Sequence, residues 1–417
     1  MQTKRVVVTG IGCITPLGNN LQDYWQGLVD GVSGADMITQ FDASKFRTRF
    51  ACEVKGFDPT DYMDRKEARK IDRFTQLAIG ASDQAMQDAG LNSSNINPDR
   101  TGVVLGSGIG GLITFQNEVI EFAKGDGTPR FNPFFIPKMI LDIAPGQVSM
   151  RHNLRGPNYS TVSACSSSTH AINTSLDLLR LGKADVMLTG GSEAVISEAG
   201  IGGFNAMKAM SERNDDPKTA SRPYDKDRNG FVMGEAGVII VLETLEHALE
   251  RGAKIYCEVA GGGATADAHH ITAPHPDGLG AQNVMLEALR DADMKIEQID
   301  YINTHGTSTP LGDIAEVKAI LNVFGEHAYK LNISSTKSMT GHCLGAAGAI
   351  EAVASIMSVI HDIVPPTINH FTDDENLDPK LNFTFNKAQK RVVNAALSNT
   401  FGFGGHNAAV IVKKYIP

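Results

Sequence analysis

Three side chains in this sequence combine a nucleophile with two potential hydrogen-bond donors. Cys165 lies in the run SACSSS, His305 in the run THGTST and His342 in the run TGHCLG. A cysteine thiolate can take up an acyl group, and two imidazoles can polarise the carbonyl of a second thioester so that negative charge develops beside it. The combination predicts carbon–carbon bond formation on thioesters.

Cys165 is predicted at or just before the first turn of a helix, because apolar residues recur with helical spacing at Ile172, Leu176 and Leu179 and the pattern ends near Gly182. Unpaired amide groups and the helix dipole favour a thiolate there, so we expect a pKa below the free value of about 8.5. The alternative is an inert buried cysteine. We assign that role to Cys13, Cys52, Cys257 and Cys343.

Each histidine taken alone could be an ordinary loop or core residue. His305 follows a strand pattern and precedes a helix, where a side chain points into a cleft, and His342 precedes a small-residue helix. Together with Cys165 the two are more specific than any pair. The histidines between Asp267 and His275 lack metal-ligand spacing, so we expect no bound metal and no cofactor.

Composition limits the class of protein. The chain has 417 residues, 42% hydrophobic and 20% charged, enough for one large core or two medium ones. Five scattered cysteines without a CxxC pair indicate a reducing compartment. Because we find no signal segment and no stretch long and apolar enough to cross a bilayer, we expect a cytoplasmic protein. A net charge of −9 speaks against nucleic-acid binding.

A short basic run interrupts this acidic background. Between Arg65 and Arg73 the run RKEARKIDR places Lys66 and Lys70, and likewise Arg65, Arg69 and Arg73, four residues apart. On one helix this spacing makes a basic stripe. It is either a solvated helix face or a docking face for an acidic partner.

The elements that must position these side chains follow an α/β pattern. Buried strands are predicted at residues 6–9, 101–105, 185–189, 237–242, 299–303 and 331–334, alternating with helices. The helical segment 85–91 resembles the segment 288–294, and the helices that open at Cys165 and near His342 hold equivalent late positions. We therefore expect two similar halves, residues 1–255 with the nucleophile and residues 256–417 with the two histidines.

The segments around these three residues, with KSMT at Lys337 and GFGG at Phe403, resemble the elongating β-ketoacyl-acyl carrier protein synthases, most closely synthase II. The similarity spans nearly the whole chain. It implies the thiolase fold, with five α-β-α-β-α layers built from two similar halves, and a homodimer. It also implies fatty acid elongation, in which a Cys-bound acyl chain condenses with malonyl-acyl carrier protein.

The resemblance implies further roles. The backbone amides of Cys165 and Phe403 would form an oxyanion hole, and Phe403 between glycines would act as a gate. His305 and His342 would donate to the malonyl thioester carbonyl while neutral. The supporting positions are Lys337 and Glu316 for the polar network, Thr307 and Thr309 for pantetheine, Ile109 for the acyl pocket, and Lys66, Arg69 and Lys70 for carrier docking.

The chain departs from the family pattern at two places. The family commonly has Thr at the position of His406 and an Ala-Thr-Gly-like run at residues 166–168, so acyl-chain preference or gate movement could differ.

Four other classes of protein are alternatives to this prediction. A thiolase would need a second catalytic cysteine near its C-terminus, where this chain has none after Cys343. A non-catalytic chain-length partner should lack Cys165, and a cysteine hydrolase has no use for two histidine donors. A polyketide-type ketosynthase of the same fold is the main competitor.

Overall fold

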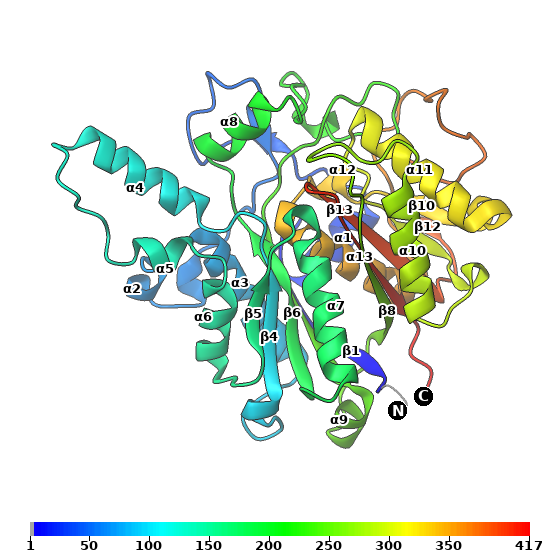
Figure 1. Ribbon diagram of the computed structural model, residues 1–417, viewed down its shortest axis with the longest axis horizontal. Coiled ribbons are helices and arrows are strands. Elements are labelled where there is room, and N and C mark those ends of the chain that lie inside the picture. Colours follow the sequence, from blue (N-terminus) through cyan, green and yellow to red (C-terminus); the bar gives the residue numbers. More distant parts are fainter. Residues whose placement is uncertain (1–3) are drawn as a thin grey trace.

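Two similar sets of strands form the centre of the molecule (Figure 1). The computed structural model describes residues 4–417. The first set has the order β5 (Asn158–Thr161), β4 (Thr101–Gly106), β6 (Val186–Glu193), β7 (Ala236–Thr244) and β1 (Val6–Ile14). The second has the order β8 (Cys257–Ala266), β14 (His406–Lys413), β13 (Ala395–Gly402), β9 (Tyr301–Asn303) and β10 (Asn332–Ser334). All six predicted strands are present.

Strand directions repeat as well as strand order. In the first set β4 runs parallel to β5 and β6, whereas β7 is antiparallel to β6 and β1. In the second set β9 runs parallel to β10 and β13, whereas β14 is antiparallel to β13 and β8. Only Val7 and Val8 of β1 pair with Glu258 and Cys257 of β8, which joins the sets into one ten-stranded sheet.

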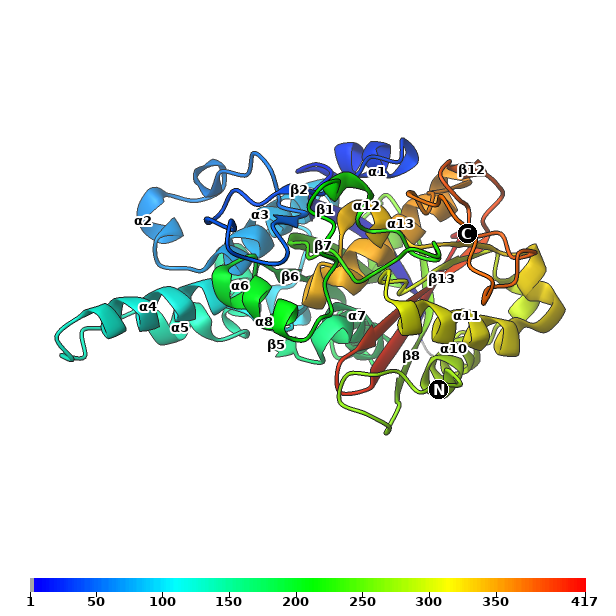
Figure 2. The same cartoon turned by 90° about the horizontal axis from the view of Figure 1, so that it is seen from above.

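Helices cover both faces of the sheets and also lie between them. α3 (Arg73–Asp88) packs on the outer face of the first set, and α10 (Leu279–Asp291) and α11 (Pro310–Phe324) cover the outer face of the second. α7 (Ser167–Arg180) and α13 (Ala347–His361) contact each other and strands of both sets, sharing one central core. The layers are therefore α-β-α-β-α, as predicted, with helices filling the centre (Figure 2).

The remaining elements flank the two sets of strands, some of them exposed and some buried. The helices are α1 (Leu21–Val29), α2 (Arg65–Ala68), α4 (Leu112–Lys124), α5 (Phe135–Met139), α6 (Ile143–His152), α8 (Glu198–Ala206), α9 (Leu245–Glu250) and α12 (Lys337–Thr340). The short strands are β2 (Asp36–Met37), β3 (Phe50–Ala51), β11 (Ile363–Val364) and β12 (Gln389–Lys390). α4 and α5 project from one side of the molecule as an arm (Figures 1 and 2).

The two central helices begin in the same way. A 3-10 turn, Ala164–Ser166, leads into α7, and a 3-10 turn, Leu344–Ala346, leads into α13. The first residue of each turn has a positive φ, 51° at Ala164 and 46° at Leu344, a conformation that is uncommon for residues with a side chain. By this correspondence Gly345 occupies in the second half the place of Cys165 in the first.

Two predictions are wrong in detail. The basic run is not one helix, because Asp72 accepts a hydrogen bond from the backbone N–H of Phe74 and so caps a new helix, while α2 has already ended at Ala68. The second error concerns apolar length. Leu344–His361 is long and apolar enough by composition to cross a membrane, yet 89% of it is buried inside the protein, which accounts for its apolar character.

Candidate active site

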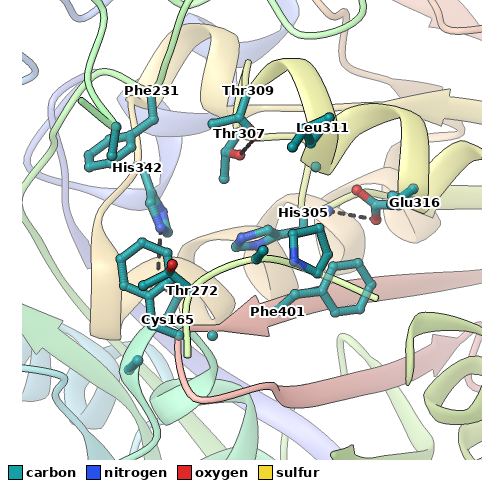
Figure 3. Close-up of a pocket in the computed structure, with 18 of the residues that line it drawn as sticks. Cys165, Phe231, Thr272, His305, Thr307, Thr309, Leu311, Glu316, His342 and Phe401 are labelled. Carbon is teal, nitrogen blue, oxygen red and sulfur yellow. Dashed lines mark hydrogen bonds between the residues drawn. The ribbon is translucent and has the colours of Figure 1, made fainter. Parts of the chain in front are cut away.

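Cys165 and His342 are in direct contact. The two residues are 177 positions apart in sequence, yet His342 Nε2 lies 3.0 Å from Cys165 Sγ (Figure 3). Cys165 is 7% exposed and follows the strained Ala164. The segment Val232–Gly234 holds His342, whose backbone N–H donates to Val232 O and whose carbonyl accepts from Gly234 N–H. These two bonds fix the backbone of His342 beside the cavity.

His305 lies beside this pair. Its ring centroid is 5.4 Å from that of His342, with the ring planes at 88°. Glu316 on α11 holds the backbone below it, since the N–H groups of His305 and Gly306 donate to the two carboxylate oxygens at 2.9 and 2.8 Å. Cys165, His305 and His342 therefore converge at one point, as predicted (Figure 3).

A buried ion pair lies behind the histidines. The ammonium of Lys337 contacts the carboxylate of Glu351 on α13, and the two side chains are 2% and 0% exposed. Burial is the main cause that lowers the pKa of both His305 and His342 well below 6.5, and the charge of Lys337 adds to it. Both rings are therefore neutral at neutral pH, the state that a hydrogen-bond donor to a carbonyl requires.

The prediction of a lowered cysteine pKa is wrong. Burial raises the pKa of Cys165 to about 12, and the charge of Glu193 acts in the same direction. Lys337 and the backbone amide of Phe403 oppose this rise without cancelling it. Burial removes the water that would stabilise the thiolate. This loss outweighs the stabilisation that the start of the helix provides. Cys165 is consequently a thiol at rest, and its proton needs an acceptor such as His342 Nε2.

These groups lie at a cavity of about 700 Å³. Thr307, Thr309, Ile109 and Phe403 line it together with the three central residues. Ile109 packs in the same apolar cluster as Cys165, and the Thr307 and Thr309 hydroxyls are 3.0 Å apart. Each predicted pocket residue therefore faces the cavity.

Glycines flank Phe403. Gly404 and Gly405 adopt φ of 91° and 74°, a region that favours glycine. The ring of His406, the departure noted in the sequence, lies beside Gly404, because a Cβ on that glycine would come within 2.8 Å of His406 Nε2. The imidazole thus contacts the GFGG turn.

The basic residues lie outside the cavity. Lys66, Arg69 and Lys70 are exposed around the end of α2. Arg73 instead turns inward and donates through Nε and Nη2 to Glu235, each at 2.8 Å. Four of the five cations of the run are therefore exposed, Arg65 beside the three predicted docking residues, and Arg73 is not among them.

Sequence reasoning missed three residues of the site. Glu351 pairs with Lys337, Phe231 lies edge-on to the His342 ring at 5.4 Å, and Glu193 is buried beneath the loop that carries Ile109. A glutamate within the apolar run of α13, or at the end of the apolar strand β6, could have been recognised as a buried charge that needs partners.

A thiolase-like fold with a buried cysteine and two neutral histidines in one cavity defines a class, the acyl-transferring condensing enzymes. The family models agree with it. Residues 3–248 match the beta-ketoacyl synthase N-terminal domain, and residues 256–371 match the beta-ketoacyl synthase C-terminal domain. The chain belongs to the beta-ketoacyl synthase family.

Named relatives resemble the chain over its whole length. It is 51% identical to 3-oxoacyl-[acyl-carrier-protein] synthase 2 of Synechocystis sp., over 100% of this chain and 99% of that protein. It is 46% identical to the protein of the same name from Coxiella burnetii, over 99% of each.

Solved structures show the same fold. The ishigamide ketosynthase/chain length factor has a TM-score of 0.93 at 33% identity, covering 99% of this chain and 100% of that one. A type II polyketide synthase ketosynthase, solved in complex with its acyl-carrier protein and bound to a hexaketide, has a TM-score of 0.91 at 31% identity and covers 100% of each chain.

Proposed function

We propose that this chain is an elongating β-ketoacyl-acyl carrier protein synthase of type II, acting in fatty acid synthesis. The single observation that carries the proposal is the contact of Cys165 Sγ with His342 Nε2, with His305 adjacent, in a cavity of about 700 Å³. Full-length identity of 51% to a synthase 2 exceeds the 31% identity to a type II polyketide synthase ketosynthase. The elongation reaction is therefore favoured over a specialised pathway.

The first half-reaction transfers the acyl group. Cys165 passes its thiol proton to His342 Nε2 as the sulfur attacks the acyl-carrier thioester. The backbone amides of Cys165 and Phe403 stabilise the oxyanion of the tetrahedral intermediate. The carrier thiolate departs and takes up one proton, while His342 keeps the Cys165 proton on Nε2 and releases the proton of Nδ1, so that Nε2 can donate in the next step. The ring is neutral again, and the acyl chain remains on Cys165 beside Ile109.

The second half-reaction makes the new carbon–carbon bond. Malonyl-carrier enters past Thr307 and Thr309, which bind its pantetheine, and neutral His305 and His342 donate to its thioester carbonyl. Loss of CO₂ leaves an enolate, whose carbon attacks the acyl-Cys165 carbonyl. Cys165 leaves as a thiolate and takes up one proton, and the acyl chain is longer by two carbons.

Lys337 and Glu316 support this site from behind. The charge of Lys337 helps to keep both imidazole rings neutral. Glu316 accepts hydrogen bonds from the backbone at His305. We assign them positioning roles, since neither side chain hydrogen-bonds a reacting group.

The partners of the chain are also proposals. The exposed cations Lys66, Arg69 and Lys70 suit an acidic acyl carrier protein, and a related ketosynthase has been solved with its carrier. The α4–α5 arm exposes apolar side chains that a second copy of the chain would cover in a homodimer. They are Phe115, Val119, Ile120, Phe122, Phe131, Phe134 and Ile136. We keep the division into halves at residues 1–255 and 256–417, and a reducing cytoplasm as the location.

The test separates the two half-reactions. Purified protein is incubated with acyl-carrier of several chain lengths and then with malonyl-carrier, while adduct mass, CO₂ and product are followed. Cys165→Ala should abolish the adduct. His305→Ala should keep the adduct but lose decarboxylation by about 100-fold or more, as when an oxyanion donor is removed. Adduct formation at another residue in Cys165→Ala would contradict the mechanism, and exclusive use of polyketide extension intermediates would favour the polyketide alternative.

A further inference from the structure

Glu193 is a fully buried carboxylate that contacts no cation. It ends β6, is 0% exposed and takes part in no salt bridge within residues 4–417. Its contacts are hydrogen-bond donors instead. The backbone N–H groups of Gly108 and Gly110 donate to it at 2.7 and 3.0 Å, and that of Gly345 at 3.0 Å. A carboxylate in such a ring of amides is stabilised as the anion.

Two further donors complete the ring. Ile109 N–H lies 3.2 and 3.3 Å from the two carboxylate oxygens, and the Ser107 hydroxyl lies 3.1 Å from Oε1. Burial raises the pKa of Glu193, and the backbone N–H groups oppose that rise. Space is tight, since a Cβ on Gly345 would lie 2.6 Å from Glu193 Oε2 and 2.1 Å from Gly108 N. The site is built for this one side chain.

The internal repeat relates the surroundings of Glu193 to those of Cys165. Gly345 stands where Cys165 stands in the other half, just after a positive-φ residue and just before a central helix. Glu193 ends β6 as Gly402 ends β13. A Cβ on Gly402 would lie 3.2 Å from Cys165 N. Gly402 has no side chain, so no carboxylate lies beside the Cys165 amide. At the corresponding position of the first half, the carboxylate of Glu193 lies beside the Gly345 amide.

We propose that Glu193 is a positioning residue. Its carboxylate lies at the Gly345 amide, the counterpart of the Cys165 amide of the oxyanion hole, and from there it fixes both walls of the active site. One wall is the loop that carries Ile109 beside the acyl pocket. The other is the segment at Gly345, three residues after His342. Because one carboxylate binds both, the loop and the histidine keep a constant distance across Cys165.

This inference deepens the proposed function and rests on it. Without Glu193, four buried amides would lose their acceptor, and Ile109 and His342 could move independently. A displacement of about 1 Å at reacting groups costs up to about 100-fold in rate. Acyl transfer and decarboxylation should both suffer, because both half-reactions use His342 and place the acyl chain beside Ile109.

The experiment compares Glu193→Gln with Glu243→Gln. Glu243 is a matched control, since it is also a 0% exposed glutamate on a neighbouring strand, and it bonds Thr9, His247 and Arg251 away from the cavity. Glu193→Gln should lower both half-reactions by about 10- to 100-fold, whereas Glu243→Gln should change stability and leave both rates within about twofold. Unchanged rates in Glu193→Gln, or equal losses in the two variants, would overturn the proposal.

A second readout separates charge from shape. The pH dependence of Cys165 alkylation by iodoacetamide reports the thiol, whose charged or titratable neighbours are Lys337, Glu193, Glu351 and His342. Glu193→Gln removes one negative charge, so the profile should move to lower pH. Glu193→Asp keeps the charge but is too short to reach both walls, so it should lose activity without that shift.

These experiments distinguish failure of the role assigned to Glu193 from failure of the proposed function. If Glu193→Gln does not fold, Glu193→Asp tests the same geometry, and wild-type rates in that variant would overturn the proposal. If the wild-type protein itself forms no condensation product, the proposed function fails first. If the wild type is active and its alkylation profile is identical to that of a folded Glu193→Gln, only the role of Glu193 fails.

Discussion

Replacing Lys337 with methionine should separate the stability of the core from its chemistry. Methionine matches the lysine side chain as far as Cε and removes the charged Nζ, which leaves Glu351 buried without its partner. Since the two side chains are 2% and 0% exposed, this is a deeply buried pair. Removing one member of such a pair costs about 3–5 kcal/mol, a large part of the roughly 5–15 kcal/mol that holds a typical protein folded.

The double variant Lys337→Met/Glu351→Leu should recover most of that loss, because no buried charge is left unpaired. Activity should not recover with stability. Without Lys337 the pKa of His305 and of His342 rises, so the acid limb of the decarboxylation profile should move to higher pH in both variants. The histidines would then depart from the neutral state at a less acid pH.

The pH dependence of the stability loss has a definite sign. Burial raises the pKa of Glu351 from 4.5 to about 7, and Lys337 partly counters that rise. In Lys337→Met the native carboxyl therefore holds a proton that the unfolded chain releases above pH 4.5. Stability of the variant should fall as pH rises through this window and on through its native pKa. The wild-type carboxyl also holds its proton up to about pH 7, so the deficit of the variant relative to the wild type should be small below that pH and should grow as the pH rises above it.

Urea denaturation followed by the fluorescence of Trp25, the single tryptophan, measures these differences. Trp25 stacks on His361 at the end of α13, the helix that carries Glu351. A loss below about 1 kcal/mol in Lys337→Met at about pH 9 would refute the reasoning, as buried pairs of this kind lose several times more. A double variant as unstable as the sum of the two single variants would refute it too, since it would show no coupling.

Three further outcomes are expected. Ile109→Phe should block acylation of Cys165 by long chains and spare short ones, measured by adduct mass, and an equal loss at all lengths would contradict the pocket assignment. Lys66→Glu/Lys70→Glu should raise KM for acyl-carrier at low salt, whereas the same reversal at exposed Lys387 and Lys390 should not; identical effects would argue against docking. In the wild type, decarboxylation should stay constant from about pH 8 to 6.5, because both histidine pKa values lie well below 6.5. A midpoint at 6.5 would contradict that.

Much of the fold could be predicted because its signals are local. Buried strands appear as apolar runs such as Gly237 to Leu242, which β7 (Ala236–Thr244) contains entirely. The repeat could be recognised from two weak similarities, the segments 85–91 and 288–294 and the two late helices. The convergence of Cys165, His305 and His342 followed from the family resemblance and not from spacing, since 177 residues separate the contacting pair.

The errors come from effects that spacing does not encode. A stripe of cations four residues apart predicts one helix, but a single capping residue, Asp72, starts a new helix and turns Arg73 toward Glu235. The pKa of Cys165 depends on burial by distant segments, and burial outweighs the helix start. Glu193 escaped notice because its partner Gly345 is 152 residues away. Glu351 escaped notice because it contacts Lys337 from a different helix, so no helical spacing links the two.

The pairing of the two halves bears on how the protein is made. A ribosome delivers the first strand set and α7 long before α13 exists, so the nascent chain carries one apolar face of its sheet uncovered until the rest follows. Cys165 is therefore synthesised well ahead of the imidazole that receives its proton. Cys165 can therefore become reactive only late in translation. A truncated polypeptide that lacks the second half would be prone to aggregate and would have no activity at this sulfur.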